Sequence, residues 1–284
     1  MAVGGILISA LVAGVAAVLV TIAIERWGGL HGGVLATVPS TIVPAAFGIW
    51  YASASVAEFQ SAMGIVPIGL ILNAGFLYLW RIIPPKIPGW RFSLRLTAIT
   101  VLTLALWFGA AGGSIFLVRE AVGGGCSSIG IGWSALLIGC LLAIWACLKR
   151  IPTPRGHKRV GAFTLVVRGL AAAVSIGVAV WLAGMGNPLS SGVMSIFPAI
   201  FTTSMVALWL AQGEAVPAGA IGPMMLGSQS VSLYALLVAI FYPRADDTFE
   251  LVMLSFAAWF LSVIIVNLSA WYWLKRRSDD SGQG

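Results

Sequence analysis

The sequence predicts an all-α polytopic membrane protein with about nine transmembrane helices, and three observations support this fold class. The chain of 284 residues is 60% hydrophobic and 9% charged, whereas about 25% of the residues of a soluble domain are charged. Apolar runs near or above ~18 residues recur along the whole chain, which is typical of membrane-spanning helices. The period-two alternation that marks a membrane β-barrel is absent from the sequence. These observations exclude a soluble fold and make the lipid bilayer an expected partner.

The apolar runs divide the chain into spans, a linker and a tail. The nine predicted spans cover residues 5–24, 33–51, 57–82, 95–118, 129–148, 162–183, 191–211, 214–241 and 249–274. Residues 1–148 contain a first repeat plus one extra span, and residues 162–274 contain a second repeat. Residues 149–161 form a basic cytoplasmic linker between them, and residues 275–284 form a polar tail that we expect to be disordered. The first span is predicted to be a mature helix because no Lys or Arg precedes Arg26, as a signal peptide would require.

The basic residues indicate how the chain is oriented. If the N-terminus lies outside, 14 of the 16 Lys and Arg residues fall in segments on the inner side, and only Arg119 and Arg244 fall outside. Cytoplasmic segments of membrane proteins are enriched in Lys and Arg, so the pattern predicts N-out, C-in. The same rule explains the net charge of +7, and no nucleic-acid partner is expected. We take a bacterial inner membrane as the default location.

The chain also contains an internal repeat. Residues of the same type recur in the same order at two successive constant offsets: Gly33, Pro39 and Trp50 match Gly192, Pro198 and Trp209, and Glu58, Pro67 and Tyr78 match Glu214, Pro223 and Tyr234. Five spans separate the equivalent first and sixth spans, and because five is odd, the two repeats are predicted to have inverted topology. Inverted repeats recur in secondary transporters, with the substrate site near the midplane. Some channels share this architecture.

Matched prolines predict broken helices. Proline removes a backbone donor and frees a carbonyl, and lipid satisfies neither group. The candidate breaks are Pro39, Pro67, Pro198 and Pro223. Matched interruptions in two repeats point to a transporter site, while a simple kink in each helix is the alternative.

Two matched acidic residues are candidates for ion or proton binding. Glu58 and Glu214 lie away from the chain ends and the basic loops, and a carboxylate inside a membrane is a functional hypothesis by default. The segment from Ser55 to Glu58 also has the pattern of a capping box, so a role as a helix cap stays open. The two histidines, His31 and His157, form no ligand set, and no particular metal is assigned.

Matched amide side chains and nearby hydroxyls are candidates to line a site. Asn73 falls opposite Gln229, and both lie about 15 residues into their helices, near the midplane. Ordinary interhelical hydrogen bonding is the alternative for both. The hydroxyl candidates follow the first prolines or flank Gln229, and they are Ser40, Thr41, Thr202, Thr203 and Ser228. They could line a cavity or bond to carbonyls of their own helices.

Taken together, these features favour a secondary-active transporter that works by alternating access between the two repeats. The expected substrate is a small cation, a metal ion or a small polar solute, with coupling to protons or another cation. An ion or small-solute channel is the alternative. A membrane enzyme is disfavoured because no nucleophile–base pair or metal cluster is visible. No cofactor is expected, the three cysteines show no framework spacing, and homo-oligomer formation stays open.

Overall fold

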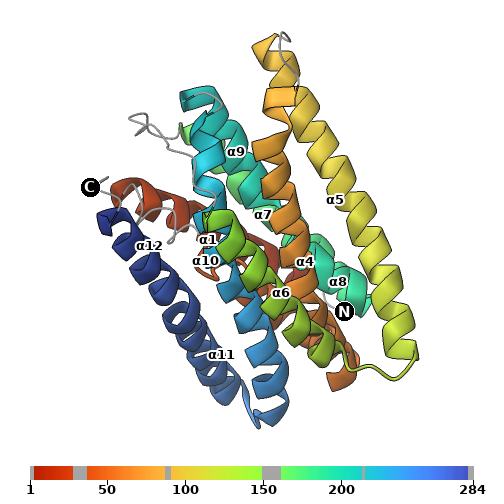
Figure 1. Cartoon of the computed structure of the whole chain (residues 1–284). Coiled ribbons are helices and arrows are strands. Elements are labelled where there is room, and N and C mark those ends of the chain that lie inside the picture. The colour runs from red at the N-terminus through yellow and green to blue at the C-terminus, as the bar shows by residue number, and fades with distance from the viewer. Residues whose placement is uncertain (1–2, 28–36, 87–90, 149–160, 213–214, 281–284) are drawn as a thin grey trace.

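A computed structural model describes residues 3–27, 37–86, 91–148, 161–212 and 215–280, and every regular element in these ranges is a helix (Figure 1). The long helices are α1 (Val3–Trp27), α4 (Val56–Ile82), α5 (Phe92–Gly123), α6 (Ser128–Leu148), α7 (Ala162–Gly184), α10 (Ala215–Phe241) and α11 (Thr248–Ser262). The shorter ones are α3 (Ile42–Ala52), α8 (Pro188–Ser195), α9 (Ala199–Gln212) and α12 (Ser269–Asp280), and a π-helical turn, η3 (Val263–Leu268), joins α11 to α12. Single 3-10 turns follow α4 and α10, at η1 (Pro84–Lys86) and η2 (Tyr242–Arg244).

Seven helical segments of the described chain are long and apolar enough to cross a membrane, so the protein is an integral membrane protein of the all-α class. They are Val56–Ile82, Phe92–Gly123, Ser128–Leu148, Ala162–Gly184, Pro188–Ala207, Ile221–Arg244 and Thr248–Arg277. Two further apolar helical segments, Gly4–Leu19 and Ile42–Ala52, are shorter. Each of these nine segments overlaps one predicted span, but the count of nine spans and the N-out orientation stay predictions.

The helices form a central group and a periphery. In their most apolar windows, α4 is 67% buried and the span built on α10 is 78% buried, whereas α5 is only 22% buried. Helices α4 and α10 pack against each other, and both pack against α6. Helix α5 stands at one edge of the bundle and α11 with α12 at the opposite edge (Figure 1). The central pair is therefore shielded from lipid on most sides, and the edge helices face the lipid.

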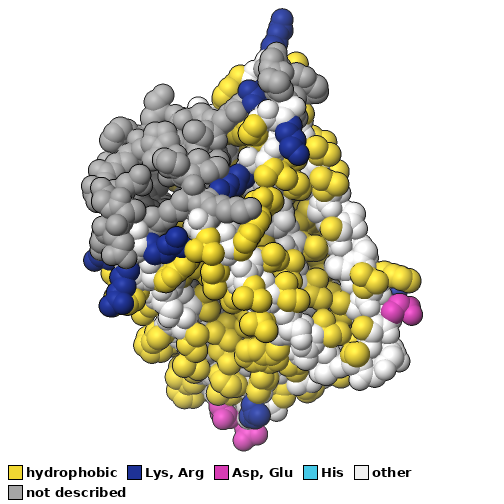
Figure 2. Space-filling model, in the orientation of Figure 1, with side chains coloured by type: hydrophobic (Ala, Val, Ile, Leu, Met, Phe, Trp, Pro, Cys, Tyr) yellow, Lys and Arg dark blue, Asp and Glu magenta, His cyan; other side chains and the backbone are white. Residues whose placement is uncertain are grey.

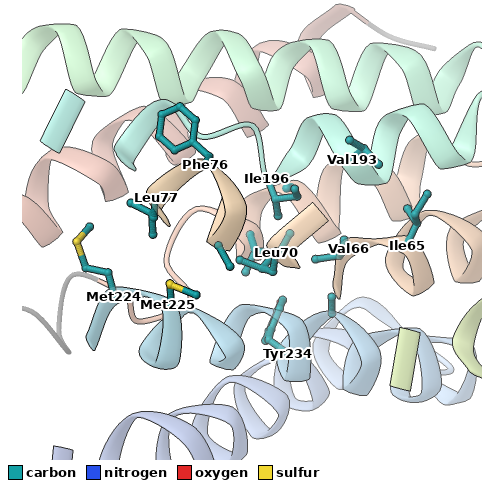
Figure 3. Packing of buried hydrophobic residues seen from close by; sticks show 14 of the residues in the cluster. Ile65, Val66, Leu70, Phe76, Leu77, Val193, Ile196, Met224, Met225 and Tyr234 are labelled. Atoms are coloured by element: carbon teal, nitrogen blue, oxygen red, sulfur yellow. The ribbon is translucent and has the colours of Figure 1, made fainter. Parts of the chain in front are cut away.

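The core around α4 combines aliphatic side chains with close helix contacts. Ile65, Val66 and Leu70 of α4 lie between Ile196 on one side and Tyr234 of α10 on the other (Figure 3). Where helices α1 and α7 cross, a Cβ added to Gly14 would lie 2.9 Å from the carbonyl oxygen of Gly169. Small residues permit such close backbone approach, which is a general basis of helix packing in membranes.

Charged side chains separate along the long axis of the bundle. Figure 2 shows most Lys and Arg side chains at the upper end, the Asp and Glu side chains in the lower part, and a largely hydrophobic surface between them. This is the distribution expected of a bundle whose middle lies in hydrocarbon.

Three segments differ from the predicted boundaries. In the second predicted span, residues 33–36 lie outside the described residues, the segment from Thr37 to Thr41 is non-helical, and α3 begins at Ile42. Helix α5 continues through Arg119 and Glu120, which were predicted to lie in a loop. The predicted linker falls almost entirely outside the described residues.

The C-terminal segment is helical as far as Asp280, so the prediction of a disordered tail from Lys275 was wrong for this stretch. Three cations of the segment lie over aromatic rings one helical turn earlier: Lys275 over Trp271, Arg276 over Tyr272 and Arg277 over Trp273, at 5.2, 4.3 and 5.1 Å from the ring centroids. Pairs four residues apart are neighbours on a helix, and a cation over an aromatic face is attracted to the ring. These contacts explain why the polar sequence continues the helix.

Candidate functional site

A cavity of about 70 Å³ lies in the interior of the bundle, where two non-helical breaks meet the long helices. The first break is the non-helical segment from Thr37 to Thr41, which precedes α3 and is described without the residues 28–36 before it. The second break is the segment from Ile196 to Pro198 between α8 and α9. Helices α4, α7 and α10 complete the wall. The polar residues that line the cavity are Thr37, Ser40, Thr41, Asn73, Ser175, Ser195 and Ser228. No Asp, Glu, Lys, Arg or His is among the lining residues in the described part of the chain.

Two helices begin at this cavity. Thr41 and Ile42 at the start of α3 line it, and so do Ala199 and Ile200 at the start of α9. The first turn of a helix leaves backbone N–H groups without an intrahelical partner, and it carries a partial positive charge. The side chain of Thr41 makes no capping hydrogen bond to α3. The first turns of α3 and α9 therefore lie at the cavity, where the Ala199 N–H already donates to the carbonyl of Phe197 at 2.7 Å.

The second break is bound by Asn73 of α4. The Asn73 side-chain amide donates to the carbonyl oxygen of Ile196 at 2.8 Å. The indole N–H of Trp107 in α5 donates to the other end of the same amide, also at 2.8 Å. Asn73 is 3% exposed and Trp107 is 2% exposed. The indole of Trp107 thus orients the buried amide of Asn73 toward the Ile196 carbonyl, which lies in the break and outside the regular helices.

The first break is bound by α10 and η3. The hydroxyl of Ser230 is within hydrogen-bond distance of two carbonyl oxygens, Thr37 at 3.0 Å and Gly227 in its own helix at 2.7 Å. The side-chain amide of Asn267 donates to the hydroxyl of Thr37 at 3.3 Å and to the carbonyl of Gly227 at 3.2 Å. Asn267 lies in the π-helical turn, a local widening of the helix that is frequent at functional sites.

Three of the six cavity hydroxyls donate to carbonyls of their own helices. Ser175 donates to Ala172, Ser195 to Gly192 and Ser228 to Met225, at distances of 2.7 to 3.0 Å. Their oxygen lone pairs remain able to accept a hydrogen bond. A solute in the cavity would meet hydroxyl oxygens and backbone N–H groups, with the amide of Asn73 at one wall.

Five of the thirteen predicted site residues line the cavity, seven other described ones do not, and Glu214 lies outside the described residues. Ser40, Thr41, Asn73, Ser228 and Pro198 lie in its wall. Thr202 and Thr203 instead donate to the carbonyls of Pro198 and Ala199, at 2.7 and 2.9 Å, which is the back-bonding alternative. Gln229 is fully buried and lies against α6, where a Cβ added to Gly139 would be 2.6 Å from its side-chain oxygen. Pro67 and Pro223 lie elsewhere, inside helices.

Among the described residues, no glutamate lines the cavity. The Glu58 backbone N–H donates to the Ser55 hydroxyl at 3.2 Å, and the Glu58 carboxylate accepts from the Ala54 N–H at 2.9 Å. This is the helix-capping alternative left open by the sequence, with the carboxylate bound to the N–H one residue before the N-cap Ser55. Glu58 is absent from the cavity wall. Glu214 lies outside the described residues.

The four prolines fall into two structural classes. Pro39 lies in the first break and Pro198 in the second. Helices α4 and α10 continue through Pro67 and Pro223, so no break appears at these two positions. Neighbouring helices can satisfy the groups that a proline frees in a membrane, and both of these helices lie in the centre of the bundle.

Sequence reasoning missed several residues of this region. Ser175 and Ser195 line the cavity, and Trp107 and Asn267 support the residues at the breaks. Asn267 could have been found as a lone amide within an apolar span. Arg168 was assigned to the inner basic segments, whereas it is 6% exposed within α7 and donates to the hydroxyls of Thr203 and Ser204. One cationic side chain is therefore buried among the described helices.

Comparison with protein-family models, with curated protein sequences and with solved structures gives no match to this chain.

Proposed function

We propose that the protein is a secondary transporter that carries a small polar solute across the membrane by alternating access. The observation that carries this proposal is the cavity between two helix breaks, where α3 and α9 begin. Interrupted helices whose ends face a midplane site are a recurrent arrangement in secondary transporters. The protein is assigned to a bacterial inner membrane, with its N-terminus outside and its basic end in the cytoplasm.

The positions of the breaks support an inverted repeat. Pro39 and Pro198 are partners in the sequence repeat, and each lies in a break. The long helices that bind the breaks, α4 and α10, contain the matched residues Pro67 and Pro223. Two independent features, the sequence register and the location of the breaks, thus favour the same pairing of the two halves.

The cavity wall favours a small polar solute over a cation or a metal ion. Its described polar groups are hydroxyls, one amide and the donors of two helix starts, and no carboxylate is present to neutralise a cation. Helix N-termini interact favourably with negative or electron-rich groups. The cavity has room for roughly five water molecules. A solute of few heavy atoms that accepts hydrogen bonds fits these properties best.

The sequence contains no nucleotide-binding fingerprint, so we assign the driving force to an ion gradient or to the solute gradient itself. Glu58 caps a helix and has no part in this proposal. Where an ion gradient drives transport, the coupling ion is a proton or a monovalent cation.

Uptake into proteoliposomes tests the proposal. Purified protein is reconstituted, and a panel of isotope-labelled small carboxylates, amides, polyols and monovalent cations is applied with and without a proton gradient. We expect saturable uptake of one uncharged or anionic class, reduced by Thr41→Val. Uptake linear in concentration, together with single-channel currents in planar bilayers, would instead establish the channel. No uptake of any solute would contradict both.

A further inference from the structure

We propose that two crossed hydrogen-bonded contacts act as latches that close the cavity toward opposite faces of the membrane. The first latch is the contact of Ser230 with Thr37, and the second latch is the contact of Asn73 with Ile196. The inference rests on the proposed alternating-access function and adds the residues that control it. Asn73 and Ser230 are positioning residues here, because each acts on a backbone segment of the other repeat.

The two latches occupy related positions in the repeat. Thr37 and Ile196 each lie two residues before a matched proline, Pro39 and Pro198. Asn73 is the register partner of Gln229, and Ser230 is the next residue after Gln229. Asn73 of the first repeat therefore contacts a carbonyl in the second break, and Ser230 of the second repeat contacts a carbonyl in the first break.

Both latches are buried and neither involves a charged group. Asn73 is 3% exposed, Ser230 is fully buried, and Thr37 is 4% exposed. Polar contacts between membrane helices are modest in strength, and losing one shifts a two-state equilibrium by about three- to fifteenfold. A contact of this strength can be broken and remade during each transport cycle, and a salt bridge is not needed.

The symmetry of an inverted repeat requires the latches to have opposite effects. The rotation that superposes the two repeats also exchanges the two faces of the membrane. If one latch stabilises closure toward the cytoplasm, its equivalent stabilises closure toward the outside. Loss of one latch therefore opens the cavity toward one face, and loss of the other opens it toward the opposite face.

Thiol labelling from each face measures this directly, and it needs no identified substrate. In a full-length background with Cys126→Ser, Cys140→Ala and Cys147→Ala, the cavity-lining substitution Ser175→Cys supplies the only thiol. A membrane-impermeant maleimide is applied to right-side-out and to inside-out vesicles. The labelling rate from each face is recorded for Asn73→Ala, for Ser230→Ala and for the double variant.

We expect Asn73→Ala to raise labelling about three- to fifteenfold from one face and to lower it from the other. Ser230→Ala should give the opposite pattern. In the double variant, the ratio of the two labelling rates should return toward that of the parent protein because the two shifts cancel. Ser230→Thr keeps the hydroxyl and should restore the parent pattern. A purely structural weakening would instead add in the double variant and would have no preferred face.

Ser262→Ala is the matched control, since Ser262 is as buried as Ser230 but donates only to Trp259 in its own helix. It should leave the labelling ratio unchanged. Shifts of both single variants toward the same face, the absence of any shift, or a thiol that reacts from neither face in every variant would overturn the latches. Shifts toward the same face together with saturable uptake would contradict the latches but not the transport function. Opposite shifts without any uptake would contradict the transport function but not the latches.

Discussion

The two breaks that flank the cavity are bound by different chemistry. At the second break, one amide accepts from an indole and donates to the Ile196 carbonyl, and both hydrogen bonds are 2.8 Å long. At the first break, the single proton of Ser230 faces two carbonyl oxygens, and the amide of Asn267 is 3.3 Å from the hydroxyl of Thr37. The second break is therefore bound by shorter and unshared contacts, and we expect it to be the more stable of the two.

The glycines beside the two breaks also indicate that the second break is the more rigid one. A Cβ on Gly192 in α8 would overlap the backbone carbonyl oxygen of Ala62 in α4, which cannot move without shifting the helix. A Cβ on Gly227 in α10 would overlap the hydroxyl of Thr37, which is the end of a side chain. The second break thus follows a rigid helix contact, whereas the first lies against an adaptable one.

The largest expected effect comes from Gly192→Ala. Because backbone must move to accept the methyl group, we expect the free energy of unfolding to fall by about 3 kcal/mol. Thermal unfolding in detergent should show a decrease in Tm of roughly 6–10 °C. Gly112→Ala in α5, where nothing lies within 4 Å of the added Cβ, is the control and should not lower Tm. Equal melting temperatures for the two variants would contradict the rigid contact.

Asn73→Ala should have the next largest effect on stability. It leaves the indole N–H of Trp107 and the carbonyl of Ile196 without their partner, which lowers the free energy of unfolding by about 2 kcal/mol. Asn187→Ala is the control for loss of a local amide contact, because among the described residues the half-buried amide of Asn187 donates to the nearby carbonyl of Met185. A similar decrease in Tm for both variants would mean that the amide of Asn73 contributes nothing specific.

Ser230→Ala should lower the free energy of unfolding by about 1 kcal/mol or less, since a shared hydroxyl contributes less than an oriented amide. Chemical denaturation in mixed micelles, compared with Ser262→Ala, gives the difference. A loss as large as that of Asn73→Ala would remove the distinction between the two breaks.

The smallest effect is expected for Glu58→Gln. Glutamine serves in a capping box as glutamate does, so stability should change by less than about 0.5 kcal/mol. Solute uptake in proteoliposomes should equal that of the wild type at each imposed proton gradient. A loss of gradient-driven uptake would instead show that Glu58 takes part in transport.

Hydropathy and the repeat predicted the apolar helices and several residues of the cavity. Each helical span was visible because a membrane segment needs about 20 apolar residues. Pro39 and Pro198 were identified as candidate breaks from their matched positions. Ser40 and Thr41 were chosen because they follow Pro39, Asn73 because it matches Gln229 near the midplane, and Ser228 because it flanks Gln229. All six lie in the cavity wall or in a break.

Proline alone was not sufficient to predict a break. Pro67 and Pro223 lie within continuous helices of the central bundle, whereas the segments of Pro39 and Pro198 carry carbonyls that Ser230 and Asn73 bind. Whether a helix breaks depends on donors that come from distant segments, and a single sequence does not reveal those contacts.

Side-chain direction was the second property that the sequence could not provide. Gln229 and Ser228 are adjacent, but Ser228 lines the cavity and Gln229 lies against α6. Successive residues on a helix differ by about 100° in direction, and the apolar face was not distinguishable in helices that are hydrophobic all round. For the same reason, Ser175 and Ser195 were not separated from other small residues.

The central claim is that the cavity between the two breaks binds the transported solute, and ligand-dependent thermal stability tests it most directly. A ligand that binds the folded protein raises Tm by mass action. A panel of small polar solutes and ions is screened against the wild type, Thr41→Val, Ser228→Ala and Glu58→Gln. We expect one class of solute to raise the Tm of the wild type and of Glu58→Gln, and both cavity variants to lose this response. A ligand that stabilises the cavity variants as strongly as the wild type would contradict binding of the solute in the cavity.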